Sequence, residues 1–186
     1  MVNYNRNLRN WNELFATTLQ EEVGLFHWHF EPGIALTDLF IEIYIPPAST
    51  QQFTKIKGYV GSYEYWQGTN VHNPISGITI SQCDASTKKS RWYNIYISKT
   101  NMNSDGEFYL HYVVDERITQ YEGYTTKQYY DDMNSTSYMF NPSYHTAWSS
   151  LGNNLNDFRF EYIPIGGVKT LLPIGTKVTI YGNVKI

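Results

Sequence analysis

The sequence predicts an all-β chain, folded as an antiparallel β-sandwich of jelly-roll type behind a short N-terminal arm or helix. From residue 25 onward, apolar and polar residues alternate in short runs, which is the period of a strand with one buried face. Turn-forming residues such as Pro46-Pro47 and Gly166-Gly167 separate many of these runs. About eight such strands in one chain suit two packed sheets.

The first 24 residues differ from the rest of the chain. Their large apolar residues recur at near-helical spacing: Leu8, Trp11, Phe15 and Leu19. Gly24 stands where a helix would end. We therefore expect an N-terminal arm or short helix over residues 1–24 and a jelly-roll domain over residues 25–186. Trp11 and Phe15 are the candidates for docking the arm onto neighbouring subunits during assembly.

The predicted strands are residues 25–30, 39–45, 53–60, 76–81, 91–98, 107–114, 157–162 and 177–182. The last of them alternates between the apolar Val178 and Ile180 and polar or aromatic neighbours, so one face should be buried. Gly175 can take a positive φ and turn the chain before this strand, and Gly182 should end it. A strand specified this well is expected to pair inside a sheet.

The closing segment of the chain carries a family resemblance. Pro173-Ile174-Gly175-Thr176-Lys177-Val178-Thr179-Ile180-Tyr181-Gly182 resembles the last strand of small jelly-roll modules in tailed-bacteriophage virion proteins. Upstream, "ALTDLFIEIYIP" and "ISGITISQCDASTKKSRWYNIYIS" look like an early strand and a mid-domain hairpin of such modules. The resemblance implies a tail, baseplate or head-fibre protein, assembled in the host cytoplasm and located in the virion. It transfers no catalytic residue to this chain.

Composition and charge limit the kinds of partner that the chain is expected to bind. The net charge is −3 and the 14 Lys and Arg residues are scattered, so no nucleic-acid partner is expected. Cys83 is the single cysteine, which excludes an internal disulfide framework. No stretch approaches the roughly 20 apolar residues of a bilayer span, so no membrane insertion is expected. The expected partners are other virion proteins, further copies of the chain in a homotrimer, and a host cell-surface glycan.

Residues 119–150 carry the predicted binding site. Their eight aromatic residues lie among Asn, Ser, Thr, Gly and Asp, a composition typical of binding loops. Sugar rings stack their C–H faces on such aromatics, and carboxylates accept their hydroxyl hydrogens. The residues expected to contact a host glycan are Tyr124, Tyr129, Tyr130, Asp131, Asp132 and Trp148. The same aromatics would also suit an assembly interface, and the sequence leaves that alternative open.

Two other groups of residues could indicate a metal site or glycoside hydrolysis. We nevertheless expect neither catalysis nor a resident metal or cofactor. His27 and His29 share one strand face, the spacing at which two imidazoles reach one metal, yet the sequence does not place a third ligand. Asp115 and Glu116 are adjacent on a strand and point to opposite faces, which does not suit the paired carboxylates of a glycosidase. A capsid decoration or assembly protein and a free-standing carbohydrate-binding protein stay as alternatives.

Overall fold

The computed structural model describes residues 11–30, 36–61, 76–81, 85–99, 108–118, 139–140, 146–148, 155 and 157–184. Its strands are β1 (Asn12–Thr18), β2 (Phe26–His29), β3 (Leu36–Ile45), β4 (Phe53–Gly61), β5 (Ser76–Thr79), β6 (Ala85–Ser86), β7 (Arg91–Lys99), β8 (Phe108–Ile118), β9 (Met139–Phe140), β10 (Thr146–Trp148), β11 (Asp157–Pro164) and β12 (Lys177–Val184). None of the described residues is helical, so none belongs to a helix able to span a membrane. The prediction of an all-β chain is confirmed.

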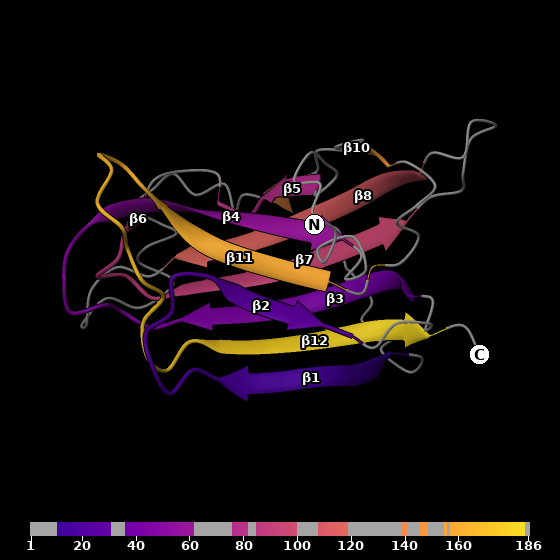
Figure 1. The fold of residues 1–186 in the computed structure, drawn as a ribbon, viewed down its shortest axis with the longest axis horizontal. Coiled ribbons are helices and arrows are strands. Elements are labelled where there is room, and N and C mark those ends of the chain that lie inside the picture. The colour runs from indigo at the N-terminus through magenta and orange to yellow at the C-terminus, as the bar shows by residue number, and fades with distance from the viewer. Residues whose placement is uncertain are drawn as a thin grey trace, which may run out of the picture.

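The strands form two antiparallel sheets packed face to face, with the smaller sheet in front in Figure 1. The larger sheet has seven strands in the order β1-β12-β3-β7-β8-β10, with β9 also paired to β8. The smaller sheet has five strands in the order β2-β11-β4-β5, with β6 also paired to β4. The predicted antiparallel β-sandwich is therefore confirmed. The eight predicted runs correspond to β2, β3, β4, β5, β7, β8, β11 and β12.

The core lies between the sheets because the long strands turn most of their aliphatic residues inward. The following inward side chains are at most 2% exposed: Leu39, Ile41, Ile43, Ile95, Ile97, Val178 and Ile180 from the larger sheet, and Ile56, Val60, Phe158 and Phe160 from the smaller. Burying each side chain of this size contributes about 1.5 to 3 kcal/mol. The alternation read from the sequence thus decides which face of each strand meets solvent.

Strand β12 is paired on both sides, as the sequence predicts for this segment. It lies between β1 and β3 and is antiparallel to both. Gly175 takes a φ of 85° in the preceding turn, which a side chain would disfavour. The prediction that Gly182 ends the strand is wrong, because β12 continues to Val184. Gly182 instead leaves room for packing, since a Cβ there would overlap the side chain of Leu14 and press on that of Leu36.

Of the two forms expected for residues 1–24, an arm or a short helix, the helix is wrong for the described part of the segment. Residues 12–18 form β1, an edge strand of the larger sheet. A register shift between Glu13 and Phe15 lets Phe15 turn inward, where its ring lies 6.1 Å from that of Phe26. Such a bulge breaks the strict alternation that identifies a strand in a sequence. The near-helical spacing therefore reflects a bulged strand.

Arg91 joins the two sheets inside the core. Its guanidinium is fully buried and donates hydrogen bonds to the carbonyl oxygen of Thr54 at 3.3 Å, to Oγ1 of Thr54 at 3.0 Å and to the carbonyl oxygen of Ala85. It also lies over the ring of Tyr162, 5.2 Å from the centroid. Because Arg91 belongs to β7 and its partners belong to β4, β6 and β11, these contacts bridge the sandwich.

Tyr93 makes a second polar connection beside it. Its hydroxyl donates to Oε1 of Glu116 at 2.9 Å and lies 3.0 Å from Oγ of Ser81, which also accepts the backbone N–H of Ile56. Burial, followed by the charge of Glu116, raises the pKa of Tyr93 well above its usual value. Burial likewise raises the pKa of Tyr162, whose hydroxyl has no hydrogen-bond partner among the described residues. Both phenols are therefore held neutral in the folded core.

Replacing Gly182 by Ala should lower the free energy of unfolding by about 1 to 3 kcal/mol, because the new methyl group overpacks the space occupied by Leu14 and Leu36. Urea denaturation measures the change. The double variant Gly182→Ala with Leu14→Ala should lose less than the sum of the two single losses, since the second change makes room for the methyl group. Strictly additive losses would contradict this packing.

The folded chain should lose stability above about pH 10, where tyrosines of the unfolded chain ionise. In this range the folded state still binds the protons of Tyr93 and Tyr162 and the unfolded state does not, so the free energy of unfolding falls as pH rises. Replacing Tyr162 by Phe should reduce this slope by up to about 1.4 kcal/mol per pH unit. Urea denaturation between about pH 9 and pH 11 measures it, and an unchanged slope in Tyr162→Phe would refute the assignment.

Candidate functional site

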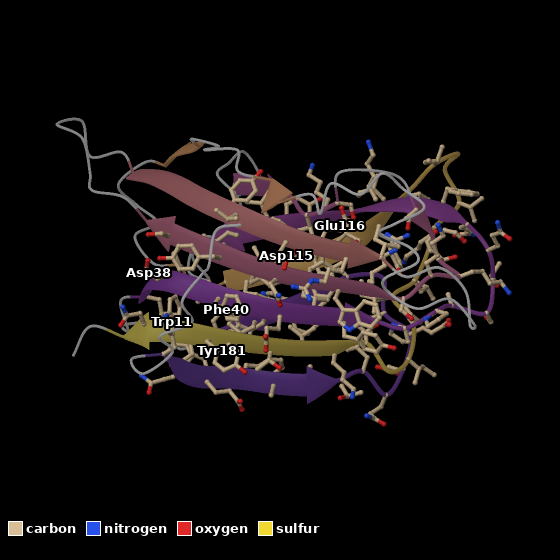
Figure 2. All side chains as sticks on the ribbon, turned by 180° about the vertical axis from the view of Figure 1, so that it is seen from behind. Trp11, Asp38, Phe40, Asp115, Glu116 and Tyr181 are labelled. Carbon is tan, nitrogen blue, oxygen red and sulfur yellow. The ribbon has the colours of Figure 1, made fainter. Side chains whose placement is uncertain are left out.

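The outward face of the larger sheet carries a row of aromatic side chains that crosses three strands. Tyr181 of β12 is paired with Phe40 of β3, and Phe40 with Tyr96 of β7. The rings of Phe40 and Tyr181 lie 5.9 Å apart, and Trp11 meets Tyr96 edge to face at 5.8 Å. Figure 2 views this face and shows Trp11, Phe40 and Tyr181 close together. We call these four residues the first aromatic row.

A second aromatic pair lies farther along the same strands. Tyr44 of β3 and Trp92 of β7 are register partners whose ring centroids are 5.1 Å apart. Lys177 is paired with Tyr44 on one side, and Arg117 with Trp92 on the other. Four residues along a strand separate this pair from the first row, a distance of about 13 Å. We call the first aromatic row and this second pair the two aromatic strips of the outward face.

Polar side chains fill the strip between the two aromatic rows. Glu42, Asn94 and Asp115 are neighbours in register on β3, β7 and β8, and all face outward. The side chain of Asp115 is 31% exposed and accepts a hydrogen bond from Arg117 at 2.9 Å. Tyr181 donates to Oε2 of Glu42 at 3.4 Å. These groups lie within reach of a ligand that rests on either set of rings.

Asp38 anchors the other side of the first aromatic row. Its Oδ1 accepts a hydrogen bond from the hydroxyl of Tyr96 at 3.0 Å. Burial and, after it, the charge and hydrogen bond of Asp38 raise the pKa of Tyr96. The phenol is therefore neutral at physiological pH and holds its ring in place, while 36% of the residue is exposed to solvent.

This arrangement offers a surface on which a ligand could rest. Asp115 faces outward, whereas the adjacent Glu116 faces the core and accepts the hydrogen bond of Tyr93. The prediction that these two carboxylates point to opposite faces is confirmed, and Figure 2 labels both. The rings offer flat apolar surfaces, and the carboxylates between them accept hydrogen bonds. A ligand with both C–H faces and hydroxyl or ammonium donors matches such a surface.

The outward face of the smaller sheet is held by ionic contacts. Nε2 of His27 lies 2.7 Å from Oδ2 of the fully buried Asp157, and Nε of Arg159 donates to Oδ1 of the same carboxylate at 3.1 Å. Beside them Tyr59 donates to Glu161 at 2.7 Å. Burial, followed by the hydrogen bond to Glu161, raises the pKa of Tyr59 to about 12. These side chains satisfy one another across β2, β11 and β4.

His27 and His29 share this outward face, as the sequence predicts, with ring centroids 5.6 Å apart. The imidazole of His27 is held in place by its contact with Asp157. Within the described ranges, no group of three or more His, Cys, Asp or Glu side chains is placed to hold a metal ion.

The residues predicted to bind a glycan are located only in part. Tyr124, Tyr129, Tyr130, Asp131 and Asp132 lie outside the described residues. Trp148 ends β10, an edge strand of the larger sheet, where its backbone is opposite Phe108 of β8. Its side chain is not among those described.

Trp11 and Phe15, predicted as assembly contacts, both lie against their own chain. Trp11 packs on Tyr96 and contributes to the first aromatic row, while Phe15 packs on Phe26 at the margin of the core. Their role in assembly stays a prediction. The residues that sequence reasoning missed are Phe40, Tyr44, Trp92, Tyr96 and Tyr181. The sequence does contain a pattern that could have identified these residues, because aromatic side chains occupy the outward positions of runs that it predicts to be strands.

Comparisons with known proteins add no assignment to this surface. No protein-family model matches the chain, and no curated protein or solved structure matches it. The candidate site therefore rests on its own geometry: two aromatic strips, a polar strip between them, and a rigid sheet that holds all three.

Proposed function

We propose that this chain is a non-enzymatic binding module whose larger sheet contacts a glycan of a host cell surface. The observation that carries the proposal is the pair of aromatic strips on the outward face of that sheet, with Glu42, Asn94 and Asp115 between them. Stacked rings favour the C–H faces of sugars, and the polar strip offers partners for their hydroxyl groups. Because strands hold these rings, little conformational entropy is lost on binding.

We further propose that the sandwich is a jelly roll. In a jelly roll of eight strands the first pairs with the eighth, the second with the seventh, the third with the sixth and the fourth with the fifth. The pairings of β1 with β12, β2 with β11, β3 with β7 and β4 with β5 support this nesting. Strands β8, β9 and β10 come between the sixth and seventh strands of the roll in chain order, and they extend the larger sheet beyond β7.

A virion location for the module follows from the resemblance of residues 173–182 to phage jelly-roll proteins. That segment contains most of β12, so the resemblance falls on a strand to which two others pair. We propose a tail, baseplate or head-fibre module on this basis. Its partners would be other virion proteins, and a homotrimer is the expected assembly.

A second candidate function, capsid decoration or assembly, is favoured by apolar side chains at one end of the sandwich. Phe53 begins β4, and its carbonyl oxygen accepts the backbone N–H of Ile165 at 3.1 Å. The exposed fractions here are 51% for Phe53, 38% for Ile163, 58% for Ile165 and 60% for Val168. Clustered apolar residues at this exposure suit a protein contact. Light scattering of the chain and of Ile165→Asp would show whether this end joins subunits.

The proposal predicts that Trp92→Ala and Tyr96→Ala each weaken glycan binding about fivefold, because a stacked ring contributes about 1 kcal/mol. An array of bacterial cell-surface glycans identifies the ligand, and calorimetry measures its Kd. Tyr59→Ala, an aromatic change on the outward face of the smaller sheet, is the matched control and should bind like the parent chain. Parent-like binding by both Trp92→Ala and Tyr96→Ala would refute the proposed surface.

The Tyr-rich segment makes a separate prediction. Tyr129→Ala with Tyr130→Ala should weaken adsorption of the module to host cells while the melting temperature stays nearly unchanged, since rings in so polar a segment are expected to contribute little to the core. Circular dichroism provides the melting temperature. If adsorption survives in this double variant, these tyrosines belong to packing, and the larger sheet carries the binding without them.

A further inference from the structure

Carboxylates surround the first aromatic row on the outward face of the larger sheet. Glu13 of β1 is the register partner of Tyr181 at one end of the row. Asp38 accepts the hydrogen bond of Tyr96, and Glu42 accepts that of Tyr181. Each of the three acidic side chains therefore lies beside an aromatic ring of the row.

The cationic side chains that the structure describes on this face lie elsewhere. Lys177 and Arg117 both flank the second aromatic pair, as register partners of Tyr44 and Trp92. Arg117 is further neutralised by Asp115 at 2.9 Å. The described outward side chains of the sheet thus include four carboxylates and two cations. The carboxylates are Glu13, Asp38, Glu42 and Asp115, and the cations are Lys177 and Arg117. Counted over the described side chains, the first aromatic row is the more negative part of the face.

Rings combined with carboxylates favour one class of ligand. The face of an aromatic ring attracts a cation through its quadrupole, and a nearby carboxylate adds a direct charge interaction. The same carboxylates repel a phosphate or uronate group that approaches these rings. A sugar with a protonated amine can stack its C–H face on Phe40 or Tyr96 and place its ammonium near Asp38 or Glu42.

We infer that the glycan bound by this face carries protonated amines, as in a polymer of glucosamine or another amino sugar, and that polyanionic glycans are excluded. The inference rests on the proposed function, because it names the ligand class of the same surface. It depends on charge complementarity between the first aromatic row with its carboxylates and an ammonium-bearing sugar.

A matched pair of oligosaccharides tests the inference. The glucosamine hexamer and the N-acetylglucosamine hexamer share one backbone and differ in the charge of the amine. Calorimetry at about pH 6 and low salt should give a Kd at least about fivefold lower for the glucosamine hexamer. The preference should shrink at about 0.5 M salt, where exposed charges are screened. Equal binding of the two, or tighter binding of a uronate hexamer, would overturn the inference and leave glycan binding intact.

Variants that remove carboxylates test which side chains cause the preference for the glucosamine hexamer. Asp38→Asn with Glu42→Gln should weaken binding of the glucosamine hexamer at least about fivefold and reduce its preference over the acetylated hexamer. Glu161→Gln is the matched control, since it also removes a carboxylate bound to a tyrosine but lies on the smaller sheet. It should leave both affinities unchanged. A preference that persists in the double variant would overturn the inference, and failure of the chain to bind any glycan on the array would overturn the proposed function with it.

Discussion

The pairing of β12 between β1 and β3 is the constraint on which the rest of the structure depends. This strand brings the two ends of the described chain into one sheet and leaves both of its own edges hydrogen-bonded. Its inward residues Val178 and Ile180 complete the core, and its outward Tyr181 completes the first aromatic row. Gly182 suits this closure, because a Cβ there would overlap the end of the Leu14 side chain and press on that of Leu36. Core and candidate surface therefore depend on the same strand.

The inward face of the larger sheet contributes to stability, and its outward face forms the candidate binding surface. Inward, Arg91 and Tyr93 carry polar contacts across the sandwich to the smaller sheet, where isolated buried groups would otherwise be costly. On the outward face, Asp38 and Glu42 accept hydrogen bonds from the hydroxyls of Tyr96 and Tyr181 and so hold these rings at the surface. Because successive residues of a strand alternate between these faces, Glu116 supports the core while Asp115, its neighbour, belongs to the surface.

Much of the fold could be predicted, and less of the candidate site. Strict alternation identifies a strand wherever it persists, as in residues 39–45 and 177–182. It failed in residues 12–18, where a bulge places Phe15 inward and makes the apolar spacing look helical. The site was sought in residues 119–150 because aromatic density is easily seen in a sequence. The first aromatic row escaped notice, since each of its strands contributes one ring to it and only the register brings these rings together.

By itself, the sequence determined the all-β class, the positions of eight strands and which residues of each could be buried, because these depend on the local period of two. Only the tertiary structure decided which strands are neighbours. Tyr181 meets Phe40, and Phe40 meets Tyr96, across separations of 141 and 56 residues that no local pattern encodes. Strand order and register are set by the packing of two whole sheets, so the aromatic face, its carboxylates and the bridge from Arg91 to Thr54 exist only in the folded chain.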